Sequence, residues 1–190
     1  MSTVSSLSKK KIDSFGKTKT SSHIDPVDKV EGRALPSNLD AEQGILAACI
    51  VDASGEVMSN CIEKALRPED FYFTKHQLVY DALLDLHNET IEPDEIVLVE
   101  KLKANGSLEQ AGGQEGITSL TSRIDTTAHA SFWLDIVKQK SLLRKCIYMA
   151  FEMIDGANQQ PSNVEDFLAT FEQKVCSLGE DQNVRASIPF

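Results

Sequence analysis

The feature that most constrains this fold is an apolar repeat near the C-terminus. Between Trp133 and Ile154, apolar side chains recur at spacings of three and four residues, at positions 133, 136, 143, 147, 150 and 154, with Lys140 as the one polar break. This period predicts one long α-helix. A second apolar series runs beside the first and comprises Val137, Leu142, Cys146, Met149 and Met153. The helix is therefore expected to be apolar on two faces.

A second helical segment follows a short loop at 156–161. Ser162 and Glu165 form a capping-box pattern, which marks the start of a helix. The apolar residues that follow at helical spacing are Val164, Phe167, Leu168, Phe171, Val175 and Leu178. Two helices joined by a short loop predict an antiparallel helical hairpin.

A hairpin alone leaves one apolar face of its first helix uncovered. Either the preceding globular part covers that face, or a second copy of the chain does, and we favour the second copy because a long terminal hairpin protrudes more easily than it folds back. The candidate residues for packing inside the hairpin or for self-association are Leu143, Ile147, Phe167 and Phe171. The sequence does not separate these two roles.

The segment before the hairpin predicts a helical globular head. Ser37 and Asn38 suit the N-cap of a first helix with Asp40 and Glu42 in its first turn. Further helices are expected near 55–65, 75–86, 93–105 and 114–123, separated by proline and glycine signals. The fold class is therefore all-α, a helical globular head followed by an antiparallel helical hairpin. The expected organisation is a disordered tail at 1–33, the head at 34–125, the hairpin at 126–180, and the start of a linker or a C-terminal tail at 181–190.

The charge distribution limits the partners of the chain. The net charge is −10, and residues 1–34 carry seven Lys or Arg against four Asp or Glu, so the remainder carries −13. An acidic body lacks the clustered cations that bind phosphates, so little direct binding of nucleic acid is expected. No apolar run is long enough to span a membrane, and no secretory signal is visible, so we expect a cytoplasmic protein without a membrane partner.

No motif of catalysis or metal binding occurs. The phosphate-loop pattern G-x-x-x-x-G-K-[ST] and the pattern GxGxxG are both missing. The histidines form no HExxH or HxH motif, and the cysteines form no CxxC pair; all four cysteines have largely apolar neighbours and are expected to be buried thiols. We therefore expect no enzyme activity and assign no catalytic, cofactor-binding or metal-binding residue.

Five short patterns, in order along the chain, are similar to the N-terminal domain of DnaB-type replicative helicases. They are Leu35-Pro36 with Ala41-Glu42-Gln43 and Ile45-Leu46; Asp70-Phe71-Tyr72 with His76; Gly106-Ser107-Leu108 with Gly112-Gly113; Ile136-Val137 with Lys140 and Leu143-Arg144; and Phe171-Glu172 to Glu180. Each pattern alone is short, but the five together cover residues 35–180. The stretch Asp125–His129 departs from the family's usual pattern, which concerns the local turn geometry.

The resemblance implies several functional expectations. It implies a collar domain of a hexameric DNA replication helicase that pairs with itself through the hairpin, as a dimer or within the hexamer, and that contacts primase or a helicase loader. ATP and Mg²⁺ would belong to the ATPase domain that follows in the family, whereas this chain ends at Phe190. The chain is therefore expected to be either a domain of a longer helicase or a stand-alone helical adaptor that regulates a helicase or primase.

Overall fold

The computed structural model describes residues 34–124 and 126–183, and it describes side chains as far as Leu178. The tail expected at 1–33 and most of the segment expected at 181–190 lie outside the described residues. Ala34–Phe190 forms one compact unit. Its described part consists of seven α-helices and one short 3-10 helix without any strand, which confirms the all-α fold class. None of the described helices has the length and apolar character needed to cross a membrane.

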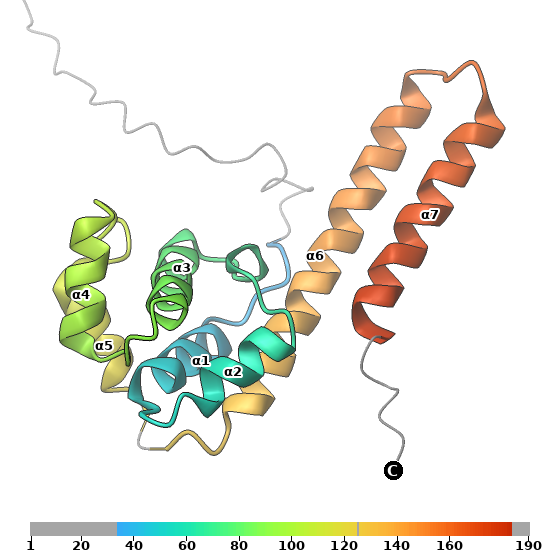
Figure 1. Ribbon diagram of the computed structural model, residues 1–190. Coiled ribbons are helices and arrows are strands. Elements are labelled where there is room, and N and C mark those ends of the chain that lie inside the picture. Colours follow the sequence, from blue (N-terminus) through green and yellow to red (C-terminus); the bar gives the residue numbers. More distant parts are fainter. Residues whose placement is uncertain (1–33, 125, 184–190) are drawn as a thin grey trace, which may run out of the picture. The chain divides into compact units, whose positions relative to one another are not determined.

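Helix α1 (Leu39–Val51) lies at the centre of the head. The side chain of Asn38 accepts a hydrogen bond from the N–H of Ala41 at 2.9 Å, which confirms Asn38 as the N-cap. The buried positions of α1 run around most of the helix and include Ile45 and Leu46. A helix that is apolar on nearly all sides must be surrounded by other elements, and α1 packs against α3, α5 and α6 (Figure 1).

The remaining elements of the head are short helices. They are α2 (Glu56–Glu63), the 3-10 helix η2 (Pro68–Asp70), α3 (Thr74–Asn88), α4 (Glu95–Ala104) and α5 (Gly113–Thr121). Gly106 follows α4 with a φ of 68°, the left-handed conformation that commonly ends a helix. Helix α4 begins at Glu95 rather than at Pro93, since the side chain of Asp94 caps it by accepting from the N–H of Val97 at 2.7 Å.

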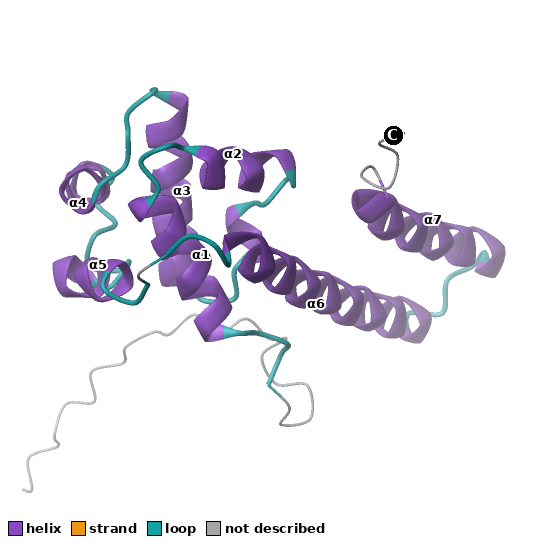
Figure 2. Ribbon diagram, turned by 90° about the horizontal axis from the view of Figure 1, so that it is seen from below, coloured by secondary structure: helices purple, strands orange, loops and turns teal. Residues whose placement is uncertain are grey.

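Two long helices form the hairpin. Helix α6 (Ala130–Asn158) leaves the head and continues beyond it, and α7 (Val164–Asn183) returns beside its second half (Figures 1 and 2). Helix α6 continues through Gly156, so the connecting loop is shorter than predicted. The predicted capping box of Ser162 and Glu165 is wrong. Asn163 caps α7 instead, because its Oδ1 accepts from the N–H groups of Glu165 at 3.0 Å and Asp166 at 3.3 Å.

Candidate functional site

The first half of α6 covers the head with one face. Its buried side chains recur at spacings of three and four residues, at Ala130, Leu134, Val137, Ser141 and Arg144. Leu134 and Val137 join the apolar core of the head. Ser141 and Arg144 are polar, although only 3% and 4% of their surfaces are exposed. Two buried polar residues at the point where α6 leaves the head require polar partners.

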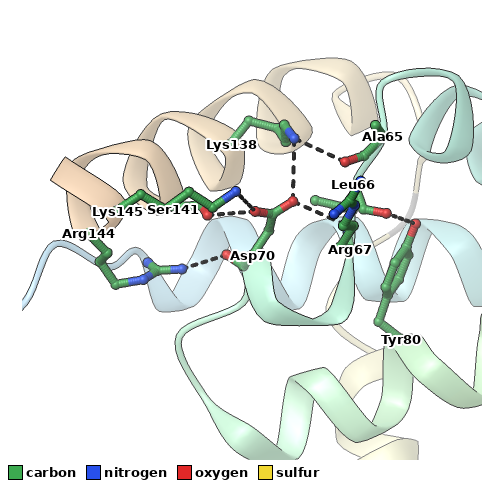
Figure 3. A network of polar contacts seen from close by, with 9 residues as sticks. All are labelled: Ala65, Leu66, Arg67, Asp70, Tyr80, Lys138, Ser141, Arg144 and Lys145. Carbon is green, nitrogen blue, oxygen red and sulfur yellow. Dashed lines mark hydrogen bonds and ion pairs between the residues drawn. The ribbon is translucent and has the colours of Figure 1, made fainter. Parts of the chain in front are cut away.

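Asp70 supplies most of these partners. Its side chain, 1% exposed, accepts a hydrogen bond from the Ser141 hydroxyl at 2.6 Å. The ammonium groups of Lys138 and Lys145 lie 3.3 Å and 3.2 Å from its two carboxylate oxygens. Figure 3 shows these side chains of α6 converging on Asp70 at the end of η2. We name the group Asp70, Lys138, Ser141, Arg144 and Lys145 the Asp70 clamp.

Arg144 extends the clamp to the start of the head. Its guanidinium donates to the carbonyl of Asp70 at 2.6 Å and to the carbonyl of Pro36 at 2.8 Å. The same group lies 5.7 Å from the centre of the Tyr72 ring, which is a cation–π distance. One side chain of α6 thus joins the segment before α1 to the segment after η2. The clamp fixes the direction in which the hairpin leaves the head.

The charge of Asp70 makes the clamp sensitive to acid. Burial alone would raise the pKa of this carboxyl, but the hydrogen bond from Ser141 and the charges of Lys138 and Lys145 outweigh burial and lower the pKa. A carboxyl with a lowered pKa in the folded state stabilises the fold above its unfolded pKa, and this contribution is lost as the pH falls through the folded pKa.

We therefore expect the free energy of unfolding to fall as the pH is lowered below about 4, because the unfolded pKa of Asp is roughly 3.9 and the folded pKa of Asp70 lies lower still. Urea unfolding followed by circular dichroism at a series of pH values measures this dependence. Asp70→Asn removes the titrating group and should flatten that part of the curve. An unchanged slope in Asp70→Asn would show that other carboxyls cause the acid sensitivity.

A second buried polar group holds the aromatic turn that precedes α3. The Glu42 carboxylate, 2% exposed, accepts from the N–H of Tyr72 at 2.8 Å and forms a hydrogen bond with Nδ1 of His76 at 2.7 Å. His76 itself is 1% exposed. This contact gives His76 a structural role and joins two of the family patterns, since Glu42 and His76 are 34 residues apart in sequence.

Aromatic side chains of α7 fill the interior of the hairpin, between α7 and α6. Phe171 is 8% exposed, and the ring of Phe167 lies so close to Gly156 that a Cβ there would meet it at 2.6 Å. The ammonium of Lys174 lies 2.5 Å from a carboxylate oxygen of Glu152. Gly156 therefore permits the close approach of α6 and α7 near the end of α6.

The side of α6 turned away from α7 exposes apolar residues. Phe132, Leu143 and Ile154 are 64%, 48% and 55% exposed. At 100° per residue, Leu143 lies about opposite Glu152, the residue of α6 that contacts α7. We name Phe132, Ile136, Leu143, Ile147, Ala150 and Ile154 the α6 stripe; Ile136 and Ile147 are half-buried and Ala150 is exposed. Ile136 packs in part against the core of the head, whereas Phe132, Leu143, Ala150 and Ile154 stay exposed within the described unit.

The four candidate residues thus separate into two pairs. Phe167 and Phe171 pack inside the hairpin, with ring centres 5.0 Å apart, whereas Leu143 and Ile147 belong to the α6 stripe. Whether the stripe contacts another chain stays a prediction. Helix α7 exposes further apolar residues on its own flank, namely Val164, Leu168 and Val175.

The cysteines differ from the expectation in two places. Cys49 and Cys61 are buried with their sulfur atoms 3.9 Å apart, and this contact and burial together raise the pKa of the Cys49 thiol. Cys146 and Cys176 are exposed, so the expectation of burial is wrong for them. They lie on the hairpin, which has little protein around it to bury its outer faces. Within the ranges 34–124 and 126–183, no group of three His, Cys, Asp or Glu residues is placed to hold a metal ion.

The sequence patterns missed the clamp. In the sequence Asp70 is noted only as part of a family pattern, but in the structure it is buried and contacts residues of α6 about 70 positions away, Ser141 being 71 residues distant. The available signal was the set of polar residues at 138, 141, 144 and 145, which recur at helical spacing in the first half of α6. That spacing places them on one side of the helix.

The fold defines a class of protein: an all-helical domain with a globular head and a two-helix arm that exposes apolar residues. The sequence matches the family model for the DnaB-like helicase N terminal domain over residues 34–139. The chain belongs to this family.

Two curated relatives indicate how much of a helicase the chain corresponds to. It is 30% identical over 162 residues to the replicative DNA helicase DnaB of Leifsonia xyli, covering 85% of this chain and 35% of the relative. It is 28% identical over 159 residues to the replicative DNA helicase DnaC of Bacillus subtilis, covering 84% of this chain and 34% of the relative. The chain thus spans about a third of the length of these relatives.

Solved structures share the fold. The N-terminal domain of DnaB helicase from Mycobacterium tuberculosis superposes with a TM-score of 0.69 and 28% identity, covering 75% of this chain and 99% of that one. A DnaB-like replicative helicase solved in a study of its interactions with primase has a TM-score of 0.61 and 22% identity, covering 74% of this chain and 31% of that one.

Proposed function

We propose that this chain acts as the N-terminal collar domain of a replicative DNA helicase and joins copies of the helicase through its hairpin. The observation that carries the proposal is the α6 stripe. An apolar surface that runs along most of a long helix and leaves Phe132, Leu143 and Ile154 exposed is typical of an interaction site. The proposal extends to a hexameric ring of such chains.

Contact with primase or a helicase loader is part of the same proposal. The family membership supports it, together with the structural neighbour that was solved in a study of its interactions with primase. We propose no catalytic role for this chain. Because the sequence contains no phosphate loop, we propose that this chain neither binds nor hydrolyses ATP and needs no cofactor, and that ATP and Mg²⁺ act in other parts of a helicase.

Charging the stripe tests self-association. We expect the wild-type chain to sediment as a dimer or larger species, and Leu143→Glu to raise the dissociation constant at least about thirtyfold, which corresponds to ~2 kcal/mol. The physical reason is the cost of burying an unpaired carboxylate in an apolar contact. Leu143 is already 48% exposed within one chain, so the circular dichroism spectrum should stay unchanged.

Two variants serve as controls. Leu168→Glu charges a residue of α7 with similar exposure, 45%, and should leave the dimer intact, whereas Phe171→Glu charges the interior of the hairpin and should unfold it. A wild-type chain that stays monomeric at high concentration would contradict the proposal. Dissociation by Leu168→Glu but not by Leu143→Glu would move the contact to the flank of α7.

A further inference from the structure

We propose that Cys49 and Cys61 form an oxidation-sensitive dithiol in the core of the head, which a peroxide converts to a disulfide between α1 and α2. The two cysteines are twelve residues apart in sequence, and their sulfur atoms lie 3.9 Å apart. A disulfide has a sulfur–sulfur distance of about 2.05 Å, so the sulfurs must approach each other by roughly 2 Å. Each cysteine turns about a single bond, so the approach is shared between two short side chains.

The closed head protects this dithiol. Cys49 and Cys61 are 1% and 0% exposed and belong to the apolar core. The contact with Cys61 is the main cause that raises the pKa of the Cys49 thiol, and burial raises it further. The thiolate is the form of cysteine that reacts with oxidants. A buried thiol with a raised pKa therefore reacts slowly until part of the head opens.

Helix α2 is the part of the head that is placed to open. Of its eight residues, Met58 and Cys61 are the buried ones. Segments held by few buried apolar side chains open at free energies below that of global unfolding. The carboxylate of Asp52, at the end of α1, accepts from the N–H of Val57 at 2.8 Å and keeps the start of α2 attached to α1. Opening of the rest of α2 thus exposes the Cys61 thiol but keeps it close to Cys49.

The reaction takes two electrons from the two sulfurs. In the opened head the Cys61 thiolate attacks one oxygen of hydrogen peroxide and the O–O bond breaks. Cys61 becomes a sulfenic acid, and the released hydroxide takes up the thiol proton to give water. When α2 closes again, the Cys49 sulfur attacks the sulfenic sulfur, the S–S bond forms and the S–O bond breaks. The departing hydroxide takes the Cys49 proton, so two thiols and one peroxide yield one disulfide and two waters.

The disulfide fixes a helix that also contacts the base of α6 (Figure 1). The side-chain amide of Asn60 donates to the hydroxyl of Ser131 at 3.1 Å, and the ammonium of Lys64 lies 2.7 Å from a carboxylate oxygen of Asp135. A covalent link between α1 and α2 restricts the unfolded chain and so stabilises the fold. Oxidation therefore holds α2 between α1 and α6 and makes the head harder to unfold.

Peroxide treatment of the 190-residue chain tests the proposal, after the exposed Cys146 and Cys176 are replaced by serine. A protease that cuts after Glu56 separates the peptides of the two remaining cysteines. Mass spectrometry should find these peptides joined, with the loss of two hydrogen atoms, and dithiothreitol should separate them again. Calorimetry should give the oxidised chain an unfolding temperature at least about 4 °C above that of the reduced chain.

The control is the same chain with Cys49→Ala. It cannot form the disulfide, so peroxide should not raise its unfolding temperature, and Cys61 should stop at the sulfenic acid, which dimedone traps. Iodoacetamide should label Cys61 of the folded, reduced parent chain at least about tenfold faster than global unfolding allows. Labelling no faster than global unfolding would overturn the opening of α2.

Two outcomes in the parent chain would overturn the proposal. Free thiols on both Cys49 and Cys61 after peroxide treatment would leave them as ordinary core residues. A disulfide that lowers the unfolding temperature would show that the link distorts the head instead of fixing it. Neither outcome bears on self-association, so the proposed function is tested separately.

Discussion

Replacing Asp70 with alanine is expected to lower the free energy of unfolding by about 3 kcal/mol. The substitution leaves the buried Ser141 hydroxyl and the N–H of Arg67, which donates to Asp70 at 3.1 Å, without their acceptor. Lys138 and Lys145 lose less, because they are 25% and 41% exposed and can turn towards water. Urea unfolding followed by circular dichroism measures the change.

A matched control for this substitution is Asp135→Ala. Asp135 lies on α6, the helix that supplies the partners of Asp70, and forms an ion pair with Lys64 at 2.7 Å, but its side chain is 55% exposed. Exposed pairs contribute about 0–1 kcal/mol. Equal losses in the two variants would mean that the Asp70 clamp contributes no more than a surface ion pair. Faster amide hydrogen exchange at residues 138–145 in Asp70→Ala would locate the effect at the junction of head and hairpin.

Replacing Glu42 with alanine is expected to cost about 3–4 kcal/mol. The carboxylate accepts from the N–H of Tyr72 and bonds Nδ1 of His76, and both donors would be left unpaired in the interior. The turn that carries Tyr72 also contacts Arg144, so loss of Glu42 should weaken the attachment of α6 as well. Thermal unfolding measured by calorimetry gives the size of the effect.

Two further substitutions, Asp40→Ala and Glu42→Gln, serve as controls for Glu42→Ala. Asp40→Ala removes another carboxylate from the first turn of α1, but Asp40 is 88% exposed beside Arg123, so a loss below about 1 kcal/mol is expected. Glu42→Gln keeps one carbonyl acceptor and should fall between the two alanine variants. A loss in Glu42→Ala as small as that in Asp40→Ala would show that the turn is held by its aromatic packing alone.

The two buried carboxylates and the apolar stripe belong to one arrangement. Glu42 positions the aromatic turn, Asp70 and Arg144 attach α6 to that turn, and the attachment directs the stripe away from the head. Stability and self-association should therefore respond separately to substitution. Changes at Asp70 or Glu42 are expected to lower unfolding energy, whereas Leu143→Glu is expected to change only association.

The sequence by itself determined the helices and their order. Apolar spacing of three and four residues predicted the two long helices, and Asn38, one of the two residues that suit the first N-cap, caps α1. The five family patterns also depended on the sequence alone, and the family is confirmed. These signals are local: each depends on residues within a few turns of one another.

Only the tertiary structure decided which face of α6 is covered. The periodicity showed that α6 is apolar on two faces, but it could not assign Phe171 to the hairpin interior and Leu143 to the exposed stripe, because burial depends on what lies opposite. For the same reason the Asp70 clamp could not be predicted from the sequence. Asp70 and Ser141 are 71 residues apart, and a polar residue in a helix has the same local pattern whether water or a distant carboxylate surrounds it.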